Sequence, residues 1–391
     1  MIAFDETNAY ETNVTAKLKV IGVGGAGNNT VNSMFKQEYN SNIEFIVTNT
    51  DAQALNASQV KNKIQLGVKL TKGLGSGANP EIGKRAAEED IDKIIEAVGD
   101  SDIVFLAAGM GGGTGSGALP VIAKALREHN TLTIAVVTKP FTFEGKRREV
   151  IAEKAIKEIY DNVDTLIVVP NQKLLDMVGE DTPMVEAFEM VNEILYQSVK
   201  GISYIITKSG HINVDFADLR VIMKDMGRAV MGTGRASGVD RAITATQEAI
   251  SSPLLENMYI KGARGVLLNI SGGSSLSLQE INQAASVIYG QADENANIIL
   301  GSVIDESIGD EVIVTVIATG CENGNPLCEP TSITENVSEN FEEKKEVEIQ
   351  ASTREIEKEP AFQIINEKII DVENLDIPTF LRTEHEEKTP E

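Results

Sequence analysis

The stretch Asp102-Ile-Val-Phe-Leu-Ala-Ala-Gly-Met-Gly-Gly-Gly-Thr-Gly-Ser-Gly-Ala-Leu-Pro-Val-Ile-Ala-Lys-Ala-Leu126 decides the fold. Its apolar run 103–108 predicts a buried strand, and the apolar spacing that leads to Leu126 predicts a helix. Six of the nine residues from Gly109 to Gly117 are glycine, with Thr114 and Ser116 as the only hydroxyls. Such a loop between strand and helix lets backbone N–H groups approach a phosphate, and the helix N-terminus adds positive charge. A tight turn with positive φ would need only one or two glycines. The stretch therefore predicts phosphate binding.

Two other glycine-rich loops follow predicted strands. A strand over 18–23 leads into Gly22-Val-Gly-Gly-Ala-Gly-Asn-Asn29 and a helix to about Gln37, which fits the dinucleotide fingerprint. A second strand, 43–47, ends at Asn49-Thr-Asp51, and an acid there would hydrogen-bond a ribose in an NAD enzyme. An NAD-type oxidoreductase is therefore a competing hypothesis. The third loop, Gly73 to Pro80, places its proline in the first turn of a helix that runs to about Val98.

The predicted strands and helices alternate along this half of the chain. Strands over 132–137 and 165–169 flank a helix at about 149–161. Alternation predicts a doubly wound parallel sheet, whose ligands bind beyond the carboxyl ends of the strands. The three glycine loops would converge there. A Walker sequence is absent, because neither Gly83-Lys84-Arg85 nor Gly145-Lys146-Arg147 continues with Ser or Thr. A dinucleotide needs one glycine loop, whereas a triphosphate bound without the Walker lysine needs several, so three loops favour a triphosphate. The phosphate charge would then fall to N–H groups, helix ends and a bound Mg²⁺.

The composition limits the class of protein. A chain of 391 residues is long enough for two cored domains, and its net charge of −24 argues against nucleic-acid partners. No apolar run reaches the roughly 18 residues of a membrane span, and the polar, acidic N-terminus does not resemble a signal peptide, so we expect a cytoplasmic protein. Cys321 and Cys328 are expected to be reduced thiols, with a disulfide or metal pair as the alternative. The three histidines suggest neither a catalytic triad nor an imidazole metal site.

A long helix is predicted to link this half of the chain to the next. Its apolar residues step by three or four over more than 20 residues: Val185, Phe188, Val191, Leu195, Val199, Ile202 and Ile206. After it, Asp215 and Asp218 lie at i, i+3 at the start of a further helix. They could serve as ordinary capping acids, or as a carboxylate pair that orients water or holds a cation for phosphoryl transfer.

A smaller α+β unit is expected from about Gly227. Its predicted strands cover 265–270, 298–304 and 312–318 around a helix over 278–290. Residues 321–391 hold 19 acidic and 7 basic side chains, a net charge of −12, which predicts a disordered linker. One apolar island, Leu375-Asp-Ile-Pro-Thr-Phe-Leu-Arg382, is either a chance cluster or a linear motif that docks in a partner's groove.

Seven motifs in order, together with a tail peptide, resemble the tubulin/FtsZ family, whose bacterial members act in cell division. The loop Gly109–Gly117 is similar to the tubulin signature loop, and residues 375–382 are similar to the family's tail peptide. The remaining motifs are Gly22–Asn28, Asn49–Asp51, Thr71–Pro80, Phe143–Arg148, Pro170–Asn171 and Asn213–Asp218. The likeness covers about residues 17–320 and the tail island.

The resemblance implies a Rossmann-like parallel-sheet GTPase domain, a long central helix and a smaller α+β C-terminal domain, followed by a disordered acidic tail. The domains it implies are a flexible arm 1–16, a GTP-binding domain 17–183, a linking helix 184–212, a C-terminal domain 213–320, an acidic linker 321–370 and a tail 371–391. GTP and GDP would be substrate and product, with Mg²⁺. The implied phosphate contacts are Gly24, Gly25, Ala26, Gly27, Asn28, Asn29, Gly77, Ala78, Gly111, Gly112, Gly113 and Thr114.

Other contacts follow from the same resemblance. Glu144 and Arg148 would meet the ribose, Asn171, Phe188 and Asn192 the guanine, and Asn49 and Asp51 complete the nucleotide-binding set. Asn213, Asp215 and Asp218 of one subunit would reach the nucleotide of the next in a head-to-tail filament. The tail residues expected to bind membrane-tethering division proteins such as FtsA are Asp376, Ile377, Pro378, Phe380 and Leu381. The implied role is a self-assembling GTPase of the mid-cell division ring, and the alternative is a nucleotide-gated scaffold without turnover.

Three residues and one segment depart from the family pattern. Ala26 and Ser116 replace residues that are often Gly and Thr, and both are small enough to fit. Asn192 stands where many members have Asp, so it offers guanine one carbonyl acceptor instead of two carboxylate oxygens. The tail ends in the acidic run Glu384-His-Glu-Glu, which argues against direct attraction of this tip to anionic lipid.

Overall fold

The computed structural model describes residues 16–37, 43–175, 182–207, 214–255 and 262–320. The N-terminal arm, Asn213, both cysteines, the acidic linker and the tail peptide lie outside these ranges, so the predictions made for them are not addressed by the structure.

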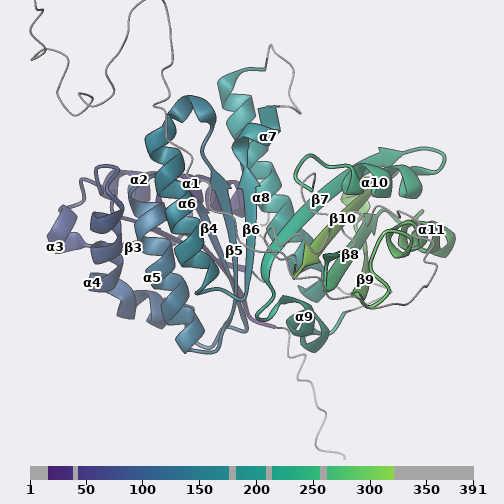
Figure 1. Ribbon diagram of the computed structural model, residues 1–391, viewed down its shortest axis with the longest axis horizontal. Helices are drawn as coiled ribbons and strands as arrows, with labels where there is room; N and C mark the ends of the chain where they lie inside the picture. Colours follow the sequence, from purple (N-terminus) through teal and green to yellow (C-terminus); the bar gives the residue numbers. More distant parts are fainter. Residues whose placement is uncertain (1–15, 38–42, 176–181, 208–213, 256–261, 321–391) are drawn as a thin grey trace, which may run out of the picture. The chain divides into compact units, whose positions relative to one another are not determined.

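One ten-stranded sheet runs through the described residues (Figure 1). Its order is β3-β2-β1-β4-β5-β6-β7-β10-β8-β9. The strands are β1 Leu18–Val23, β2 Ile43–Asn49, β3 Asn62–Gln65, β4 Ile103–Gly109, β5 Leu132–Lys139, β6 Thr165–Pro170, β7 Gly227–Ser237, β8 Gly265–Gly272, β9 Asn297–Ile304 and β10 Glu311–Thr319. All neighbours pair in parallel except β10, which is antiparallel to both β7 and β8. The predicted mostly parallel, doubly wound architecture is confirmed.

Helices cover both faces of this sheet. Their bounds are α1 Gly24–Gln37, α2 Ala52–Ala57, α3 Val68–Thr71, α4 Pro80–Val98, α5 Thr114–Glu128, α6 Lys146–Tyr160, α7 Asn171–Leu175, α8 Met184–Thr207, α9 Phe216–Met223, α10 Arg241–Ile250 and α11 Leu278–Tyr289. Short 3₁₀ turns, η1 Thr142–Glu144 and η3 Glu306–Ile308, complete the set. The predicted long helix is therefore α8, and the helix expected at about 149–161 begins three residues earlier.

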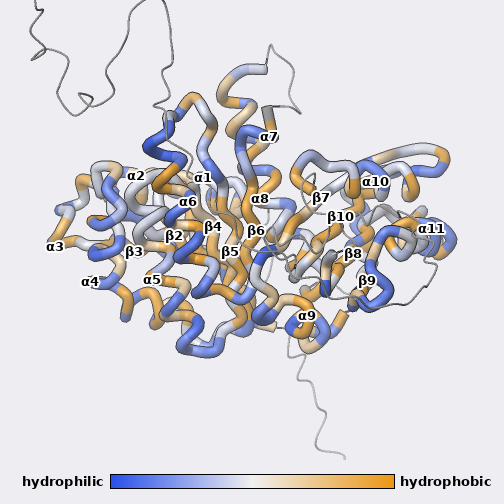
Figure 2. Tube along the Cα trace, in the orientation of Figure 1, coloured by the Kyte–Doolittle hydropathy of each residue, from blue (hydrophilic) through white to orange (hydrophobic). Residues whose placement is uncertain are grey.

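Alternation along the central strands builds two apolar layers. In β4, Ile103 and Phe105 face one layer, whereas Val104 and Leu106 face the other. The first layer packs against α1 and α8, and the second against α4, α5 and α6. Because both faces are covered, β4 is apolar almost throughout, as expected of a parallel strand. Figure 2 shows the strands as a hydrophobic centre bounded by more hydrophilic helices.

Two elements of the C-terminal part, β7 and α10, lie at the start of the expected α+β unit, in a stretch for which we predicted no specific strand or helix. Glycines are strand breakers in a sequence, yet β7 contains Gly232 and Gly234. A Cβ on Gly232 would stand 1.9 Å from the carbonyl oxygen of Ala249, and one on Gly234 would stand 2.0 Å from that of Ala245. These glycines therefore allow α10 to lie directly on the strand.

No helix in the described ranges combines the length and the apolarity that a bilayer span requires.

Candidate functional site

A cavity of about 510 Å³ opens where the central strands end. It begins at Val23, the last residue of β1, at Gly109, the last residue of β4, and at Asn171, which follows β6. Its lining residues are Val23, Gly25, Ala26, Asn29, Thr30, Ser76, Gly109, Met110, Gly112, Gly113, Thr114, Gly115, Thr138, Pro140, Glu144, Arg148, Asn171, Phe188, Val191, Asn192 and Leu195. The predicted convergence of glycine loops at this edge of the sheet is what the structure shows.

Two helices begin at the cavity. α1 starts at Gly24 directly after β1, and α5 starts at Thr114 after an N-cap glycine, Gly113, that supplies no side-chain cap. The first N–H groups of a helix have no partner within the helix, and they carry a partial positive charge. Two such ends at one cavity, with Arg148 as the single cation among the described residues that line it, form a site for a strongly anionic group.

The glycines of the signature loop serve two different purposes. Gly113, Gly115 and Gly117 are needed for packing, because a Cβ on each would stand within 2.5 Å of a neighbouring oxygen. Gly112 is different, because nothing lies within 4 Å of its Cβ position and its φ is not positive. The same holds for Gly25 in the first loop. Neither packing nor backbone conformation requires glycine at these two positions, so the space beside the bare backbone is open to a ligand.

A chain of hydroxyls joins the loops below the cavity. Thr114 Oγ1 lies 2.7 Å from Thr50 Oγ1 and 3.1 Å from Ser76 Oγ. Ser116 Oγ accepts a hydrogen bond from the N–H of Gly111 at 2.9 Å, so the serine that departs from the family pattern braces the loop. The loops that follow β2, β4 and the third glycine stretch are thereby held in one arrangement.

The far end of the cavity combines an aromatic ring with two amide side chains. Phe188 is 39% exposed, and its ring lies edge-on to that of Phe141 at 5.4 Å. Asn171 is 5% exposed, and its Oδ1 has no hydrogen-bond partner among the described residues. Asn192 Oδ1 accepts from Thr30 Oγ1 at 3.0 Å. An aromatic face beside a buried, unsatisfied amide can stack and hydrogen-bond a nucleobase.

Glu144 and Arg148 form an ion pair at the rim of the cavity. Glu144 Oε1 also accepts from the N–H of Phe141 at 2.9 Å, which fixes the carboxylate. A carboxylate held in this way can accept hydrogen bonds from the hydroxyls of a sugar.

Several predicted contacts do not line the cavity: Gly24, Gly27, Asn28, Asn49, Asp51, Gly77, Ala78 and Gly111. A Cβ on Gly27 would stand 2.2 Å from the carbonyl oxygen of Ala107, so this glycine is required for packing. Asn28 is 2% exposed, and with its amide nitrogen inward it donates to the carbonyl oxygens of Gly22, Gly24 and Thr48. Gly27 and Asn28 therefore contribute to the shape of the first glycine loop.

Asp51 has a structural partner of its own. Its Oδ1 accepts from the N–H groups of Gln53 at 2.8 Å and Ala54 at 3.2 Å, which caps α2. Asn49 is buried, and its Oδ1 accepts from the N–H of Asp51. The oxidoreductase hypothesis needed the Asp51 carboxylate for a ribose, and the structure gives that carboxylate to a helix N-terminus.

The lining also includes residues that we did not select from the sequence. Ser76 stands within the third glycine loop, and Thr30 lies in the second turn of α1, where a small hydroxyl side chain gives no signal of its own. Val191 and Leu195 belong to the buried stripe of α8 and also line the cavity, so one helix face serves both the core and the site.

Asp215 and Asp218 lie at the opposite edge of the sheet. Asp215 occupies the N-cap position of α9, but its side chain makes no capping hydrogen bond, and both residues are exposed. Neither side chain has a partner among the described residues. Thr165 Oγ1, at the start of β6, donates to the carbonyl oxygen of Met223 at the end of α9 at 2.5 Å. Figure 1 accordingly shows α9 at the lower edge and α7, which follows β6, at the upper edge.

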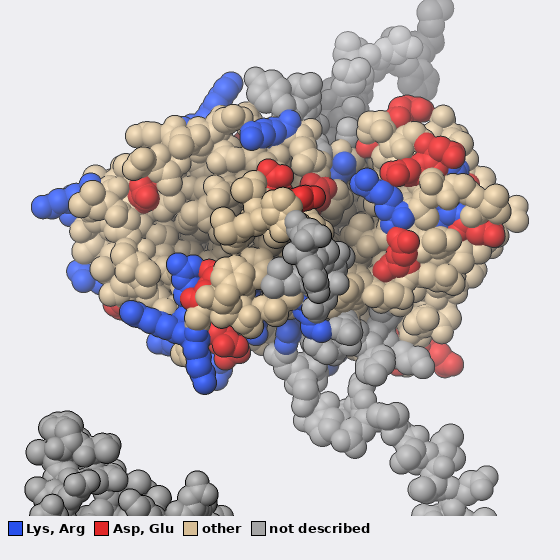
Figure 3. Space-filling model, turned by 90° about the horizontal axis from the view of Figure 1, so that it is seen from above, with Lys and Arg blue, Asp and Glu red and all other residues tan. Residues whose placement is uncertain are grey.

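The face on which the strands end is seen in Figure 3. Lys and Arg side chains lie mainly along its left and lower rim, and Asp and Glu side chains gather on the right, on the side of α10.

Comparison with known proteins gives two matches that together extend over most of the described chain. Residues 17–179 match the Tubulin/FtsZ family, GTPase domain, and residues 227–322 match the FtsZ family, C-terminal domain. The empty FtsZ dimer of M. jannaschii is 42% identical, with a TM-score of 0.75 over 78% of this chain and 88% of that one.

Two more distant structures share the fold. The GDP-bound CetZ1 monomer of Haloferax volcanii is 22% identical, with a TM-score of 0.69, over 78% of this chain and 95% of that chain. The GTPgS-bound CetZ2 protofilament of the same organism is 21% identical, with a TM-score of 0.67, over 78% of this chain and 94% of that chain. The glycine-lined cavity at the sheet edge, the two domain matches and the 42% identity lead to one conclusion: the chain belongs to the tubulin/FtsZ family and is a GTPase.

Proposed function

We propose that this GTPase polymerises head to tail and hydrolyses GTP at the junction between two subunits. The observation that carries the proposal is the separation of two halves of a site. The cavity lies beyond the end of β6, and the exposed pair Asp215 and Asp218 lies beyond its start. Six residues of strand span about 20 Å, so the carboxylates of a copy are far from its own cavity.

The cavity would hold the nucleotide in an extended arrangement. The N-termini of α1 and α5, with the bare backbone at Gly25 and Gly112, would receive the phosphates. The Glu144–Arg148 pair would meet the ribose. The guanine would lie against Phe188, where the unsatisfied Oδ1 of Asn171 would accept from its exocyclic amine or N1–H.

Mg²⁺ would be held mainly by the phosphates. The described residues contain no group of three or more His, Cys, Asp or Glu that could hold a metal, and Glu144 is the only carboxylate of the lining. Mg²⁺ keeps several waters and accepts phosphate oxygens readily, so this donor set fits an ion that arrives with the nucleotide. When bound, it would neutralise charge on the phosphates. Gly112, Gly113 and the hydroxyl of Thr114 would hold the phosphate group in place.

The group that orients the attacking water would be supplied by the neighbouring copy. Phosphoryl transfer needs a group that orients the attacking water, and carboxylates commonly do so. Asp215 and Asp218 are exposed, their side chains are free of partners among the described residues, and Asn213 stands beside them in the sequence. Docked on the cavity of a second copy, this segment would complete the site. Hydrolysis would then require assembly, and it would weaken the contact between the two subunits, because the nucleotide lies in that contact.

The joint would propagate as an open filament. Its two surfaces are different, and contacts between unlike surfaces extend without closing unless the rotation forms a ring. The solved relatives include an FtsZ dimer and a CetZ2 protofilament, which supports self-association here by likeness.

We further propose the cellular role that this family membership suggests. The filament would form a division ring at mid-cell in the cytoplasm, and residues 376–381 of the tail would recruit membrane-tethering division proteins such as FtsA. The sequence boundaries 1–16, 17–183, 184–212, 213–320, 321–370 and 371–391 would divide the chain into arm, GTP-binding domain, linking helix, C-terminal domain, linker and tail.

The test uses full-length Asp215→Ala and Asp218→Ala. We expect both to bind GTP as the unaltered chain does, and to release phosphate at least about a hundredfold more slowly, because each removes a group that acts in the transition state. Glu294→Gln, which alters an exposed acid outside α9, is the matched control and should hydrolyse normally.

A mixing experiment separates a shared site from a local one. Asp215→Ala added to unaltered protein should lower phosphate release per unaltered subunit, because active joints need the loops of one copy and the acids of another. A decline strictly proportional to dilution, or full activity in a demonstrably monomeric sample, would contradict the proposal.

A further inference from the structure

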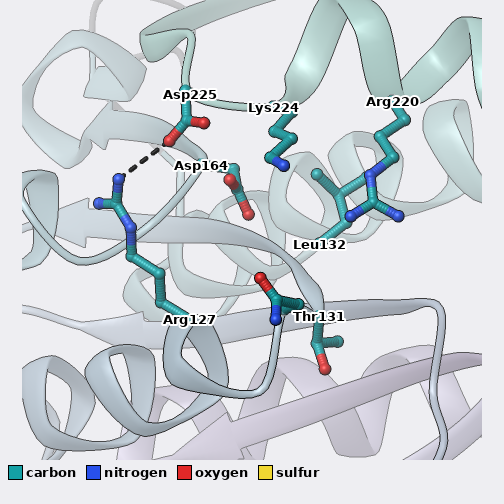
Figure 4. A pocket seen from close by; sticks show the side chains of 8 residues that line it. Arg127, Thr131, Leu132, Asp164, Arg220, Lys224 and Asp225 are labelled. Carbon is teal, nitrogen blue, oxygen red and sulfur yellow. Dashed lines mark hydrogen bonds and ion pairs between the residues drawn. The ribbon is translucent and has the colours of Figure 1, made fainter.

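A second hollow, of about 200 Å³, lies at the edge where the strands begin (Figure 4). Arg127 comes from the last turn of α5, Leu132 begins β5, and Asp164 directly precedes β6. Arg220 and Lys224 come from α9 and its C-cap. This hollow shares no lining residue with the nucleotide cavity and is not used by the proposed reaction.

Its basic side chains are only partly neutralised. Arg127 donates to the carbonyl oxygen of Asp161 at 2.7 Å and pairs with Asp225 Oδ1 at 2.9 Å, the dashed contact in Figure 4. The side chains of Arg220 and Lys224 have no hydrogen-bond or ion-pair partner among the described residues. In a chain of net charge −24, two unpaired cations that share one hollow favour an anion.

A buried carboxylate in the same hollow restricts which anion fits. Asp164 is 6% exposed, and its Oδ2 accepts from the N–H of Thr133 at 2.8 Å. Its Oδ1 has no partner among the described residues. Figure 4 shows this carboxylate and the amino group of Lys224 pointing into one space, with Arg220 on the far side of Lys224. A fully ionised anion would be repelled by Asp164, whereas an anion that still carries a proton can donate it to the free oxygen.

We propose that this hollow is a binding site for inorganic phosphate. Arg220 and Lys224 bind its oxygens, and its remaining P–OH group donates to Asp164 Oδ1. Both ionic forms of phosphate near neutral pH keep such a proton. Sulfate has none, and a phosphate monoester has largely lost its own because its second pKa is about 6. The site therefore distinguishes free phosphate from both of these anions.

Phosphate is also the product of GTP hydrolysis. Bound here, it would connect α9 to the first residues of β5 and β6, and α9 carries Asp215 and Asp218 at its other end. The site thus places a binding site for the reaction product at one end of the helix that carries the proposed catalytic acids at its other end. The phosphate site is formed by residues of a single chain, so it does not depend on the proposed junction. Phosphate binding can therefore be measured without assembly.

The test is calorimetric titration of the full-length protein, saturated with GDP so that the nucleotide cavity is filled, at pH 7.5 in a buffer free of other oxyanions. We expect saturable binding of inorganic phosphate, with sulfate and methyl phosphate each at least about tenfold weaker. Arg220→Gln and Lys224→Gln, both at the surface, should each weaken phosphate binding at least about tenfold. Lys124→Gln, an exposed cation of α5 outside the hollow, is the control and should leave it unchanged.

Asp164→Asn tests the selectivity itself. Its amide oxygen can still accept from Thr133, but the carboxylate is lost, so the preference for phosphate over sulfate should disappear. Equal binding of sulfate and phosphate by the unaltered protein would overturn the proposal, as would phosphate binding that survives both Arg220→Gln and Lys224→Gln. Absence of saturable binding at millimolar phosphate in protein that binds GDP normally would also overturn it, and would leave the proposed junction unaffected.

Discussion

The hydroxyl oxygen of Thr30 lies 3.0 Å from Asn192 Oδ1 and 3.1 Å from the carbonyl oxygen of Ala26, so both oxygens are within hydrogen-bond distance of it. The hydroxyl has one proton, which it can donate either to Ala26 or to Asn192. The acceptor that receives the proton decides whether the oxygen or the nitrogen of the Asn192 amide faces Thr30. If Thr30 donates to Ala26, the amide nitrogen can donate to Thr30, and its oxygen is left for the guanine N1–H. Thr30 would thus orient the base-reading amide.

We predict that Thr30→Val weakens GTP binding by roughly tenfold, because the amide loses the partner that orients it. Thr30→Ser keeps the hydroxyl and should bind nearly as well as the unaltered chain. Asn192→Asp should bind GTP more tightly, since a carboxylate accepts from Thr30 and from guanine together. Affinities measured by fluorescent-nucleotide competition would check this order. Equal affinities for Thr30→Val and Thr30→Ser would contradict it.

We predict that alanine substitutions at two neighbouring glycines of the signature loop affect different properties: GTP affinity at Gly112 and stability at Gly113. Gly112→Ala places a methyl group in open space, so it should change the free energy of unfolding by less than about 0.5 kcal/mol but weaken GTP binding severely. Gly113→Ala places it 2.3 Å from Ser76 Oγ and 2.7 Å from the N of Asn79, so it should destabilise the nucleotide-free fold by about 1–3 kcal/mol. Denaturant unfolding without nucleotide, with GTP titration, separates the two effects. Normal GTP affinity in Gly112→Ala would argue against a ligand at this backbone.

The buried guanidinium of Arg241 gives the C-terminal part a dependence on acid. It contacts Glu280 Oε1 at 2.7 Å and Asp310 Oδ1 at 2.7 Å. The Arg241 hydrogen bond, with help from Ser277, lowers the pKa of Glu280 from 4.5 to about 2. A carboxyl whose pKa is lowered by folding contributes its full stabilisation at any pH above its pKa in the unfolded chain. For Glu280 this contribution is lost as the pH falls from about 4.5 to about 2. The difference is equivalent to about 3 kcal/mol at most.

We therefore predict that Glu280→Gln is less stable than the unaltered chain at pH 7 by up to about 3 kcal/mol, and that the gap closes toward pH 2. Urea unfolding of both proteins over this pH range measures the gap. A difference that stays constant with pH would show that the carboxylate charge contributes nothing and that only its geometry matters.

Asp90 fastens α4 to the loop before α3. It is 5% exposed, its Oδ2 accepts from the N–H of Gly67 at 2.7 Å, and its Oδ1 pairs with Lys93 at 2.6 Å. Its φ of −120° interrupts the helix at that point. We predict that Asp90→Ala destabilises the fold by about 1–3 kcal/mol, because the Gly67 N–H is left without its partner. Hydrogen exchange should show faster exchange at Gly67, and unchanged protection there would contradict this role.

In the nucleotide-binding half, β1, β2, β4, β5 and β6 were predictable because each is a short apolar run. The polar edge strand β3 was missed, since its four residues, Asn62–Gln65, carry no such run. The strand over 103–109 and the helix from Thr114 follow from local pattern alone. The strand β7 was not predictable, because its glycines signal a break until α10 is seen against it. A close approach between two elements distant in sequence has no local signal.

The same division holds for the candidate site. The sequence by itself determined the order of the glycine loops, the edge at which they meet and the family resemblance, since these depend on residue type and spacing. Only the tertiary structure decided that Asp51 caps a helix, that Asn171 keeps a free oxygen, and that Asp215 makes no capping bond. A side chain's partner depends on which distant groups compete for it, and that competition exists only in the folded chain.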